Sequence, residues 1–600
     1  MHLPDRLSLS APLMEPLQPI SPTPAVVRGA GDVPTVHPRG TNATILLTSV
    51  FGPYAQDDEY GSRSLNPMEL YQNQVTRAEG PFSLRMFHRS WGIMLIQANI
   101  SAPCVVLDFP TLDRFIQELR EHDYDIIGIS SILPNIGKVQ TMCRLIREYQ
   151  PGATIVVGGH LANMPGLERQ VEADHIVRGE GVRWFRQFLG EETGRPIRHP
   201  MVSSAVWTRT MGMPISNNGR SAAATVIPSV GCPMGCNFCA TSAMFGGKGK
   251  FVNFYETGDE LFRIMCGLER AMGVRAFFVM DENFLLHKKR ALRLLELVER
   301  YGKAWSLYVF SSAHVIKTYA MEQLVRLGVS WVWMGLEGRK SRYVKLQGID
   351  TRSLVRELQE NGIRVLGSSI IGLEEHTPEN IANVIDYAVS HATDFHQFML
   401  YTPIPGTALY AEHLANQTLL SPDEYDEADI HGQSVFRHKH PHIPKGQEAA
   451  MILQAFQRDF DVNGPSVLRI ARTLLKGWTK YRSHGDRRIR NRFAWEARDL
   501  ALTYPASLWA ARRWFGQRSP QLAQSLARLL EDIAREVGLK ARLAAPLVGR
   551  LVFFALHREA RRLKRGTTYE PPTFYEMNEA MRCALVRSRR AASLSRYVTA

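Results

Sequence analysis

Hydrophobic and polar positions between residues 41 and 195 alternate between short β-branched runs and amphipathic segments. The runs lie at residues 44–50, 103–108, 125–131, 153–157 and 175–177. The segments between them have the 3.6-residue period of helices, at residues 112–122, 139–149 and 182–189. Strands that alternate with helices in this order form a parallel sheet with helices on both faces. We therefore expect an α/β, Rossmann-like doubly wound domain over residues 41–200.

The same alternation of strand and helix occurs six times between residues 225 and 410. The candidate strands are residues 225–230, 276–280, 305–310, 331–334, 364–371 and 395–400. Eight such units close a complete barrel. Six units predict a partial (β/α)6 barrel over residues 201–415, with a lateral gap wide enough for a large substrate. The residues that follow each strand are expected to form the site, because barrel chemistry lies at the carboxyl ends of strands.

The two ends of the chain differ from these domains. Residues 1–40 hold eight prolines and little periodicity, which predicts a disordered leader. They lack the basic start and apolar stretch of a signal peptide, and no apolar run of about 18 residues crosses a bilayer. We therefore expect a cytoplasmic protein. Helical periodicity, such as Leu522, Leu526, Leu529 and Ile533 at i, i+4, i+7 and i+11, predicts an α-helical domain over residues 416–600.

Positive charge is concentrated in this helical domain. Residues 446–600 contain 29 Lys and Arg against 13 Asp and Glu, a net charge of +16, whereas the whole chain carries +14. The arginines interleave with Trp509, Trp514, Phe553 and Phe554. The simplest interpretation is a solvated basic face on a helical cap. Peripheral contact with an anionic membrane, at its inner face, is a second interpretation. Nucleic acid is disfavoured because no RNA-binding module is recognisable.

Three cysteines form the clearest chemical motif of the chain. Cys232, Cys236 and Cys239 have the spacing C-x3-C-x2-C. A four-iron cluster has four ligand positions, so three thiolates leave one iron open to a small molecule. A structural zinc site would need a fourth ligand, which the loop lacks. A disulfide fits poorly because nothing indicates secretion. The three cysteines are therefore predicted to bind a 4Fe-4S cluster and to be the catalytic residues.

This spacing, with the aromatic Phe238 before the last cysteine, resembles that of the radical S-adenosylmethionine superfamily. The resemblance implies that the open iron binds S-adenosylmethionine, and that the reduced cluster splits it into methionine and a 5′-deoxyadenosyl radical, which takes hydrogen from the substrate. It also implies an electron donor such as flavodoxin or ferredoxin. The S-adenosylmethionine contacts that we expect are Phe238, Asp281, Glu282, Ser311, Glu337 and Ile404.

Small residues and glycines follow three strands of the first predicted sheet. Ligands of doubly wound sheets bind beyond the carboxyl ends of the strands. This edge, with its G-G-x-H and G-E-G turns, resembles the cobalamin-binding domain of the cobalamin-dependent radical S-adenosylmethionine enzymes. The cobalamin contacts that the resemblance implies are Ser130, Ser131, Asn135, Gly158, Gly159, His160, Gly179, Glu180 and Gly181. The D-x-H-x-x-G motif is absent, so cobalamin would bind without a histidine on its lower face.

Residues 51–90 interrupt the first sheet with a long segment. Its polar and aromatic side chains, and those that follow it, indicate order: Tyr71, Arg77, Arg85, His88 and Trp91. Loops of this length are commonly functional. We expect the segment to cover the cobalamin face or to shape the substrate entrance.

These observations favour a methyltransferase that acts on an unactivated carbon of an apolar, lipid or isoprenoid-like small molecule. The cofactors would supply the chemistry, and the protein would supply orientation and a dry pocket. Two alternatives stay open: a radical enzyme that cyclises or couples a tetrapyrrole or lipid, and, in another class, an RNA-modifying enzyme. A non-catalytic cobalamin sensor is disfavoured by the complete cysteine triad.

Overall fold

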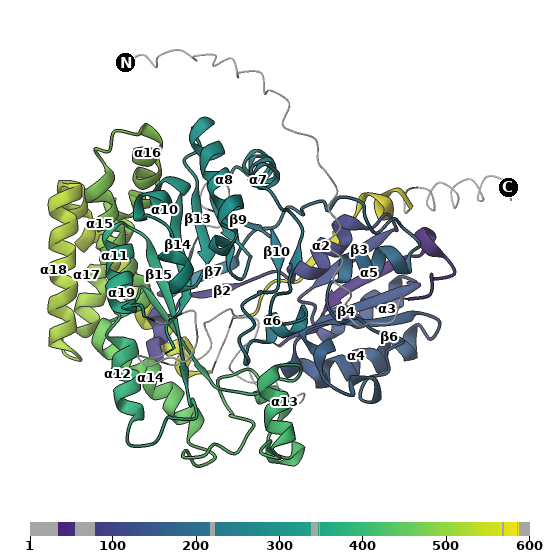
Figure 1. Ribbon diagram of the computed structural model, residues 1–600. Coiled ribbons are helices and arrows are strands. Elements are labelled where there is room, and N and C mark those ends of the chain that lie inside the picture. The colour runs from purple at the N-terminus through teal and green to yellow at the C-terminus, as the bar shows by residue number, and fades with distance from the viewer. Residues whose placement is uncertain are drawn as a thin grey trace.

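The computed structural model describes residues 34–53, 78–215, 222–337, 346, 348–566, 569–584 and 586. The chain forms two lobes, which Figure 1 shows side by side: a sheet with α3, α4 and α5 on the right, and a barrel with the C-terminal helices on the left. Most of the predicted leader, and the predicted Tyr71 and Arg77, lie outside the described residues.

A six-stranded sheet forms the centre of the first lobe. Its order is β17-β3-β1-β4-β5-β6, and the five strands β3-β1-β4-β5-β6 are parallel. This is the doubly wound arrangement that the sequence predicts. The bounds are β1 Ile45–Ser49, β3 Cys104–Asp108, β4 Ile126–Ser131, β5 Thr154–Gly159, β6 His175–Ile176, α2 Trp91–Asn99, α3 Leu112–Glu121, α4 Ile136–Tyr149 and α5 Gly181–Phe188.

Consecutive side chains of these strands point to opposite faces, and both faces are apolar. Leu46 and Ile127 pack with the α3 and α4 side, whereas Leu47 and Ile126 pack with the α2 and α5 side. A strand buried on both faces reads as a continuous hydrophobic run. This burial explains why the runs in the sequence are unbroken rather than alternating.

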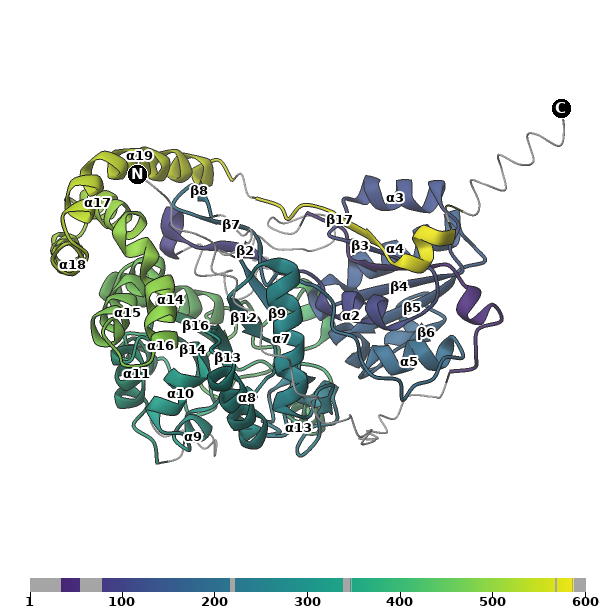
Figure 2. The ribbon, with the colours of Figure 1, turned by 90° about the horizontal axis from the view of Figure 1, so that it is seen from above.

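The edge strand β17 (Phe574–Met577) comes from the far end of the chain. It pairs antiparallel with β3, and Figure 2 shows the chain crossing from α19 to the first lobe. Asn578 then accepts a hydrogen bond from the backbone N–H of Cys104 at 3.0 Å. The C-terminal region therefore forms α-helices between residues 448 and 564, and β17 completes the first sheet. Residues 416–447, which the sequence predicts to belong to the helical domain, hold short 3-10 helices and turns instead.

The second lobe is an open barrel of six parallel strands in the order β16-β15-β14-β13-β12-β9. The two end strands do not pair with each other, which agrees with the predicted partial barrel. The bounds are β9 Ala223–Val226, β12 Ala276–Val279, β13 Ser306–Phe310, β14 Val329–Gly335, β15 Arg364–Ile371, β16 Phe395–Leu400, α7 Gly258–Met272, α8 Lys288–Arg300, α9 Ala313–Ile316, α10 Met321–Leu327, α11 Thr351–Glu360, α12 Ile381–Val389 and α13 Ala408–Ala415.

The first barrel strand is shorter than predicted. The sequence predicts one strand over residues 225–230, but β9 ends at Val226 and Ser229–Val230 forms a separate strand, β10. Proline has no N–H to donate to a ladder, so Pro228 ends the pairing with β12. β10 leads the chain into the cysteine loop and pairs antiparallel with β11 (Val252–Asn253), which follows that loop.

The segment before the first lobe's helices lies at the base of the barrel. β2 (Arg85–Phe87) joins a three-stranded sheet with β7 (Val206–Thr210) and β8 (Met213–Pro214). Phe82 stacks on Phe515 with ring centroids 5.2 Å apart, and Glu79 accepts a hydrogen bond from the backbone of Ser466. The described part of residues 51–90 that follows the gap therefore packs against the C-terminal helices rather than over the cobalamin face.

Helices α14 to α19 cover the base and one side of the barrel (Figure 1). Their bounds are α14 Glu448–Asn463, α15 Ser466–Tyr481, α16 Arg487–Glu496, α17 Thr503–Phe515, α18 Pro520–Val537 and α19 Leu539–Lys564. The predicted stripe Leu522, Leu526, Leu529 and Ile533 is buried on α18. Over the described residues, no helix combines the length and the hydropathy needed to span a bilayer.

Candidate active site

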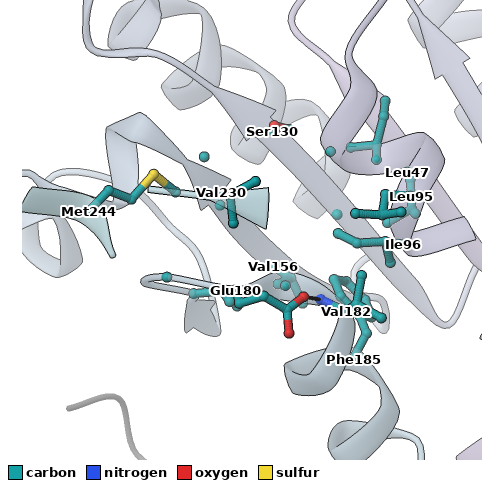
Figure 3. Close-up of a pocket in the computed structure, with 18 of the residues that line it drawn as sticks. Leu47, Leu95, Ile96, Ser130, Val156, Glu180, Val182, Phe185, Val230 and Met244 are labelled. Atoms are coloured by element: carbon teal, nitrogen blue, oxygen red, sulfur yellow. Dashed lines mark hydrogen bonds between the residues drawn. The ribbon is translucent and has the colours of Figure 1, made fainter. Parts of the chain in front are cut away.

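A cavity of about 160 Å³ lies where the carboxyl edge of the first sheet faces the cysteine loop of the barrel. On the first lobe it is lined by Leu47, Ile96, Val182 and Phe185, and on the barrel side by Val230 and Met244 (Figure 3). Phe245 and Phe254 complete the barrel side. The walls are almost wholly apolar, so the cavity favours an apolar or aromatic part of a ligand.

Glycines decide the shape of this cavity. A Cβ at Gly158 would have no neighbour closer than the Val177 carbonyl oxygen at 4.0 Å, and one at Gly179 none closer than the Met244 oxygen at 4.0 Å. Side chains at these positions would therefore fill the cavity. Gly159 differs, because its φ is +80° and its Cβ would lie 2.4 Å from the Ser131 oxygen. Gly159 is required by the backbone, whereas Gly158 leaves space for a ligand.

The cysteine loop is fixed by backbone contacts at both ends. Gly231 and Gly235 have φ values of +85° and +66°, and a Cβ at Gly235 would lie 2.4 Å from the Cβ of Lys248. The Ser242 hydroxyl donates to the Cys232 carbonyl at 2.6 Å. The Cys239 Sγ accepts a hydrogen bond from the Ser242 N–H at 3.5 Å, at the start of α6 (Ala240–Met244). The turn therefore carries its three thiols in one compact loop.

The thiols lie in a partly buried, sulfur-rich environment. Burial, with smaller effects from Cys239, Cys236 and Glu282, raises the pKa of Cys232 to about 11. Without a cation the Cys232 thiol would stay protonated at neutral pH, whereas a bound iron would deprotonate it. None of the three cysteines forms a disulfide within the described residues, and all three have intermediate exposure. Three thiols on one glycine-rich loop fit an iron–sulfur cluster with a single open corner.

The loop is also attached to the last barrel strand. The Asn237 side chain donates to the Tyr401 hydroxyl at 3.0 Å, and the Phe238 ring lies edge-on to Tyr401 at 6.1 Å between centroids. Leu409 donates its backbone N–H to the Asn237 oxygen at 2.9 Å. Phe238, a predicted S-adenosylmethionine contact, therefore lies between the cysteine loop and the carboxyl end of β16.

The two predicted carboxylates after β12 have different surroundings. Asp281 is buried and forms an ion pair with the buried Arg290, while its other oxygen accepts the Asn283 N–H at 3.1 Å. Burial, and then the neighbouring Asp281, raise the pKa of Glu282 to about 7. Glu282 also contributes to the raised pKa of Cys232, which places it near the cysteine loop. Of the two, Glu282 is the one suited to hold a ligand cation.

The remaining predicted barrel residues also lie after their strands. Ser311 donates its hydroxyl to the Asn283 side chain at 3.0 Å. Glu337 is buried, and a Cβ at Gly335 would lie 2.4 Å from one of its carboxylate oxygens. Ile404 packs against the core of the first lobe, and its carbonyl accepts the Thr407 hydroxyl at 2.6 Å. Ile404 therefore links the barrel to the first sheet.

The predicted cobalamin residues divide into two groups. Those that line the cavity are Ser130, Gly158, Gly159, Gly179, Glu180 and Gly181. Ser131, Asn135 and His160 do not line it. Ser131 donates its hydroxyl to the Ile132 oxygen, and Asn135 is buried beside α4. The short helix that begins at His160 contacts α6, and burial lowers the pKa of His160.

Glu180 is a predicted cobalamin contact that already has partners in the protein. It is the N-cap of α5, where its carboxylate accepts the backbone N–H groups of Val182 and Arg183. An N-cap carboxylate satisfies donors that a helix start leaves unpaired. In Figure 3 its side chain lies at the lower rim of the cavity. Its structural contribution is to hold the start of α5 at that rim.

Two family matches fall on the two lobes. Residues 87–189 match the B12 binding domain, and residues 226–388 match the Radical SAM superfamily. The first range contains the glycine edge, and the second contains the cysteine loop and the barrel strands β12 to β15. Both edges line the same cavity. The chain belongs to the cobalamin-dependent radical S-adenosylmethionine enzymes.

Two relatives illustrate the range of this family. The chain is 24% identical over 347 residues to an uncharacterized methyltransferase of Pyrococcus horikoshii, covering 52% of this chain and 74% of that protein. It is 23% identical over 354 residues to an anaerobic magnesium-protoporphyrin IX monomethyl ester cyclase of Cereibacter sphaeroides, covering 51% of this chain and 56% of that protein.

A solved structure of the radical S-adenosylmethionine methyltransferase TsrM of Kitasatospora setae, with tryptophan and a SAM analog bound, also matches this radical S-adenosylmethionine enzyme. The two chains share 17% sequence identity with a TM-score of 0.44, and the match covers 69% of this chain and 89% of the TsrM chain.

The cofactors of this radical S-adenosylmethionine enzyme are a 4Fe-4S cluster, S-adenosylmethionine and cobalamin. The residues present fit all three. The cysteine loop offers three thiols, Glu282 offers a carboxylate beside them, and the apolar cavity beside Gly158 and Gly179 leaves the space that side chains there would fill.

Sequence reasoning missed the residues that join the lobes. Val230, Met244, Phe245 and Phe254 line the cavity from the barrel side, and Ile96 does so from α2. A Cβ at Gly406 would also lie 3.2 Å from the Cβ of Asn163 in the other lobe. No local pattern marks these residues, because in a sequence an apolar side chain that lines a cavity cannot be told from one in the hydrophobic core. Only their position between the two edges reveals them.

Proposed function

We propose that this enzyme transfers a methyl group to an unactivated carbon of an apolar small molecule. The observation that carries the proposal is the single cavity lined by both the glycine edge of the B12-binding lobe and the residues around the cysteine loop. When bound, the cofactors supply a hydrogen-abstracting radical and a methyl donor. Because the two sites share one cavity, both would act on the same substrate carbon.

The residues of this chain would hold and orient these groups. Cys232, Cys236 and Cys239 would hold the cluster through their thiolates. Glu282 would hold the S-adenosylmethionine ammonium, since a carboxylate in a partly dry site attracts a cation strongly. Ser311, Glu337 and Ile404 lie on the same barrel rim and stay candidates for the rest of that ligand.

The inner wall of the barrel supports an apolar substrate. Five aromatic rings line its concave face: Phe278, Tyr308, Phe310, Trp331 and Trp333. Tyr308 stacks on Trp331 at 5.7 Å, and Phe310 stacks on Trp333 at 5.0 Å between centroids. The rings other than Phe278 are only half-buried. Aromatic surface of this kind takes up apolar or planar molecules and excludes water, which would quench a radical.

A cavity of about 370 Å³ extends this wall toward the base of the barrel, beside His88, Phe278, Tyr308 and Trp331. Burial lowers the pKa of His88 to about 4, so the ring is neutral. Its Nδ1 donates to the Ser204 carbonyl, which leaves Nε2 as an acceptor, and Nε2 has no hydrogen-bond partner within the described part of the chain. The interior of the barrel therefore has room for an elongated apolar substrate and provides one hydrogen-bond acceptor, His88 Nε2.

Oxidative cyclisation or coupling of a tetrapyrrole or lipid is the second candidate function. The same cofactors would serve it, and the similarity to the cyclase of Cereibacter sphaeroides favours it. Methylation adds one CH2 to the substrate, whereas cyclisation removes two hydrogens. The reaction also needs a low-potential electron donor, for which we propose a flavodoxin or a ferredoxin.

The experiment uses anaerobically reconstituted enzyme with dithionite and S-adenosylmethionine that carries a labelled methyl group. Cleavage is measured first, and Cys232→Ala, Cys236→Ala and Cys239→Ala are each expected to abolish it with the loss of cluster iron. Cys266→Ala, at a half-buried cysteine of α7, is the matched control and should keep both S-adenosylmethionine cleavage and cluster iron. Cleavage that survives a triad substitution would contradict the assignment.

The second step adds isoprenoid lipid and tetrapyrrole fractions as substrates. Label recovered in a product heavier by one CH2 supports methyl transfer. A product lighter by two hydrogens, without label, would replace the proposal with cyclisation. Label in added tRNA alone would place the enzyme among RNA-modifying enzymes.

A further inference from the structure

Helix α19 buries Val552 and Leu556 against the protein but leaves four large apolar side chains exposed to solvent. The side chains that it packs inward include Ala541, Ala545 and Ala555. A Cβ at Gly549 would lie 2.6 Å from the Trp509 ring of α17, so the two helices approach closely there. A helix that only caps a domain keeps its large apolar residues on the inner face, so those that α19 exposes indicate a second apolar surface.

The outward face of α19 is an apolar stripe of four residues. Leu543, Leu547, Leu551 and Phe554 are 61%, 67%, 71% and 64% exposed. At about 100° per residue, these four positions fall within an arc of about 80°. Figure 2 shows α19 along the outer edge of the molecule, with no labelled element beyond it. The stripe is therefore continuous and accessible along much of the helix.

Arginines continue this face beyond the stripe. Arg550 lies about 20° outside its arc, and Arg558, Arg561 and Arg565 follow within the arc, all of them exposed. Together with Phe554 and Tyr569, three of them border a groove of about 430 Å³. Glu559, the single acidic residue of α19, is buried and paired with Arg562 at 2.6 Å. The groove is therefore strongly basic and directly adjoins the apolar stripe.

We propose that α19 docks this enzyme on an anionic lipid surface. The apolar stripe would enter the boundary between headgroups and acyl chains, and the arginine groove would take the phosphates of the headgroups. Amphipathic helices with a basic polar side bind such interfaces through apolar burial and electrostatic attraction. A nucleic acid would use the arginines but not four exposed apolar side chains. A second protein copy would use the apolar stripe but would oppose arginine to arginine.

The docking face adjoins the substrate-binding lobe. α19 packs on α17, and Tyr504 of α17 lines the cavity at the base of the barrel. A lipid surface that binds α19 would therefore be separated from that cavity by α17. This link to an apolar substrate rests on the proposed function, whereas the docking itself does not.

The two tryptophans that the sequence associates with this surface pack inside the lobe instead. Trp509 packs on Gly549, and Trp514 packs on Phe82 and His557 with ring centroids 5.9 and 4.9 Å away. These tryptophans hold α17 and α19 to the rest of the lobe. The docking face consists of leucines, Phe554 and arginines instead.

The test is sedimentation of the full-length holoenzyme with vesicles of phosphatidylcholine, with and without phosphatidylglycerol. We expect binding that requires phosphatidylglycerol and weakens as salt is raised. The double variant Leu547→Glu/Leu551→Glu should bind at least about tenfold more weakly, because it places two carboxylates in the interface. Leu414→Glu, at a 59% exposed leucine of α13, is the matched control and should bind as the wild type.

A second variant tests the groove independently. Arg558→Gln/Arg561→Gln/Arg565→Gln is expected to lose the preference for phosphatidylglycerol while its melting temperature and S-adenosylmethionine cleavage stay unchanged. Cleavage is assayed without vesicles, so a failure of docking is distinguishable from a failure of the proposed chemistry.

Four outcomes would overturn the proposal. The wild type could remain in the supernatant with both kinds of vesicle. The double glutamate variant could bind as well as the wild type. A wild-type dimer that this variant dissociates would assign the stripe to a second copy of the chain. Salt-sensitive binding of tRNA that only the arginine variant loses, without vesicle binding, would assign the groove to nucleic acid.

Discussion

Gly362 and Gly477 bring the barrel and the C-terminal helices into direct backbone contact. A Cβ at Gly362 would lie 2.6 Å from the Cα of Gly477, and a Cβ at Gly477 would lie 2.8 Å from the Cα of Gly362. The Phe493 ring of α16 would lie 2.7 Å from either added carbon. Since Gly362 also has a φ of +71°, the turn before β15 and the middle of α15 leave no room for a side chain.

We expect Gly477→Ala to lower the stability of the protein. Alanine favours a helix over glycine, but the added methyl must displace backbone and a packed ring, which costs about 1–3 kcal/mol. The measurement is the midpoint of anaerobic chemical denaturation. Gly485→Ala, where a Cβ meets nothing within 4 Å, is the control and should leave the midpoint unchanged or slightly higher. Equal effects of the two substitutions on the midpoint would show that the close approach of Gly362 and Gly477 does not constrain how α15 packs on the barrel.

Glu79 makes the stability of the protein depend on pH. Its buried carboxylate accepts the Ser466 N–H at 2.9 Å, and burial raises its pKa to about 7, above the value of about 4.5 of the unfolded chain. The folded state therefore binds an extra proton between these values. The stabilisation from this proton is complete below about pH 4.5 and is lost as the pH rises through about 7, by at most about 3 kcal/mol.

The check compares the wild type with Glu79→Gln at about pH 5 and about pH 8. The melting temperature of the wild type should fall between the two pH values by more than that of the glutamine variant, because glutamine does not titrate. Parallel curves for the two proteins would contradict the assigned pKa.

Gly158→Val should prevent cobalamin binding while the protein folds normally. The valine side chain would enter the cavity, where the nearest protein atom to its Cβ is 4.0 Å away. Cobalt content after anaerobic reconstitution measures the effect, and cluster iron should not change. Gly159→Ala should instead destabilise the first lobe, because its φ is +80° and its Cβ would meet the Ser131 backbone. Full cobalt loading of the valine variant would place cobalamin elsewhere.

Glu282→Gln and Asp281→Asn should have different consequences. The first removes a carboxylate that has no ion-pair partner among the described residues, so we expect weaker S-adenosylmethionine binding in a stable protein. The second leaves Arg290 without its buried partner, which typically costs about 3–5 kcal/mol. Binding isotherms and melting curves of both variants separate the two roles. Unchanged S-adenosylmethionine affinity in the glutamine variant would remove Glu282 from the site.

The local elements of both lobes were readable from the sequence. A strand buried on both faces and a helix buried on one face leave patterns within a few residues, so β4, β15 and α18 lie where the periodicity predicts them. Pro228 shows the limit of this reading. The apolar run through residues 225–230 is continuous, but a missing N–H divides it into two strands of different sheets.

By itself, the sequence determined the cysteine triad, the glycine edge and the order of strands and helices, because each is encoded within a short stretch of chain. Tertiary structure alone decided which of two adjacent carboxylates is committed to Arg290, that β17 returns to pair with β3, and which face of α19 is outward. These features depend on which distant groups compete for burial and hydrogen bonds. Leu551 and Leu556 are identical in a pattern, and only the packing of α19 on the lobe decides that Leu556 is buried while Leu551 is exposed.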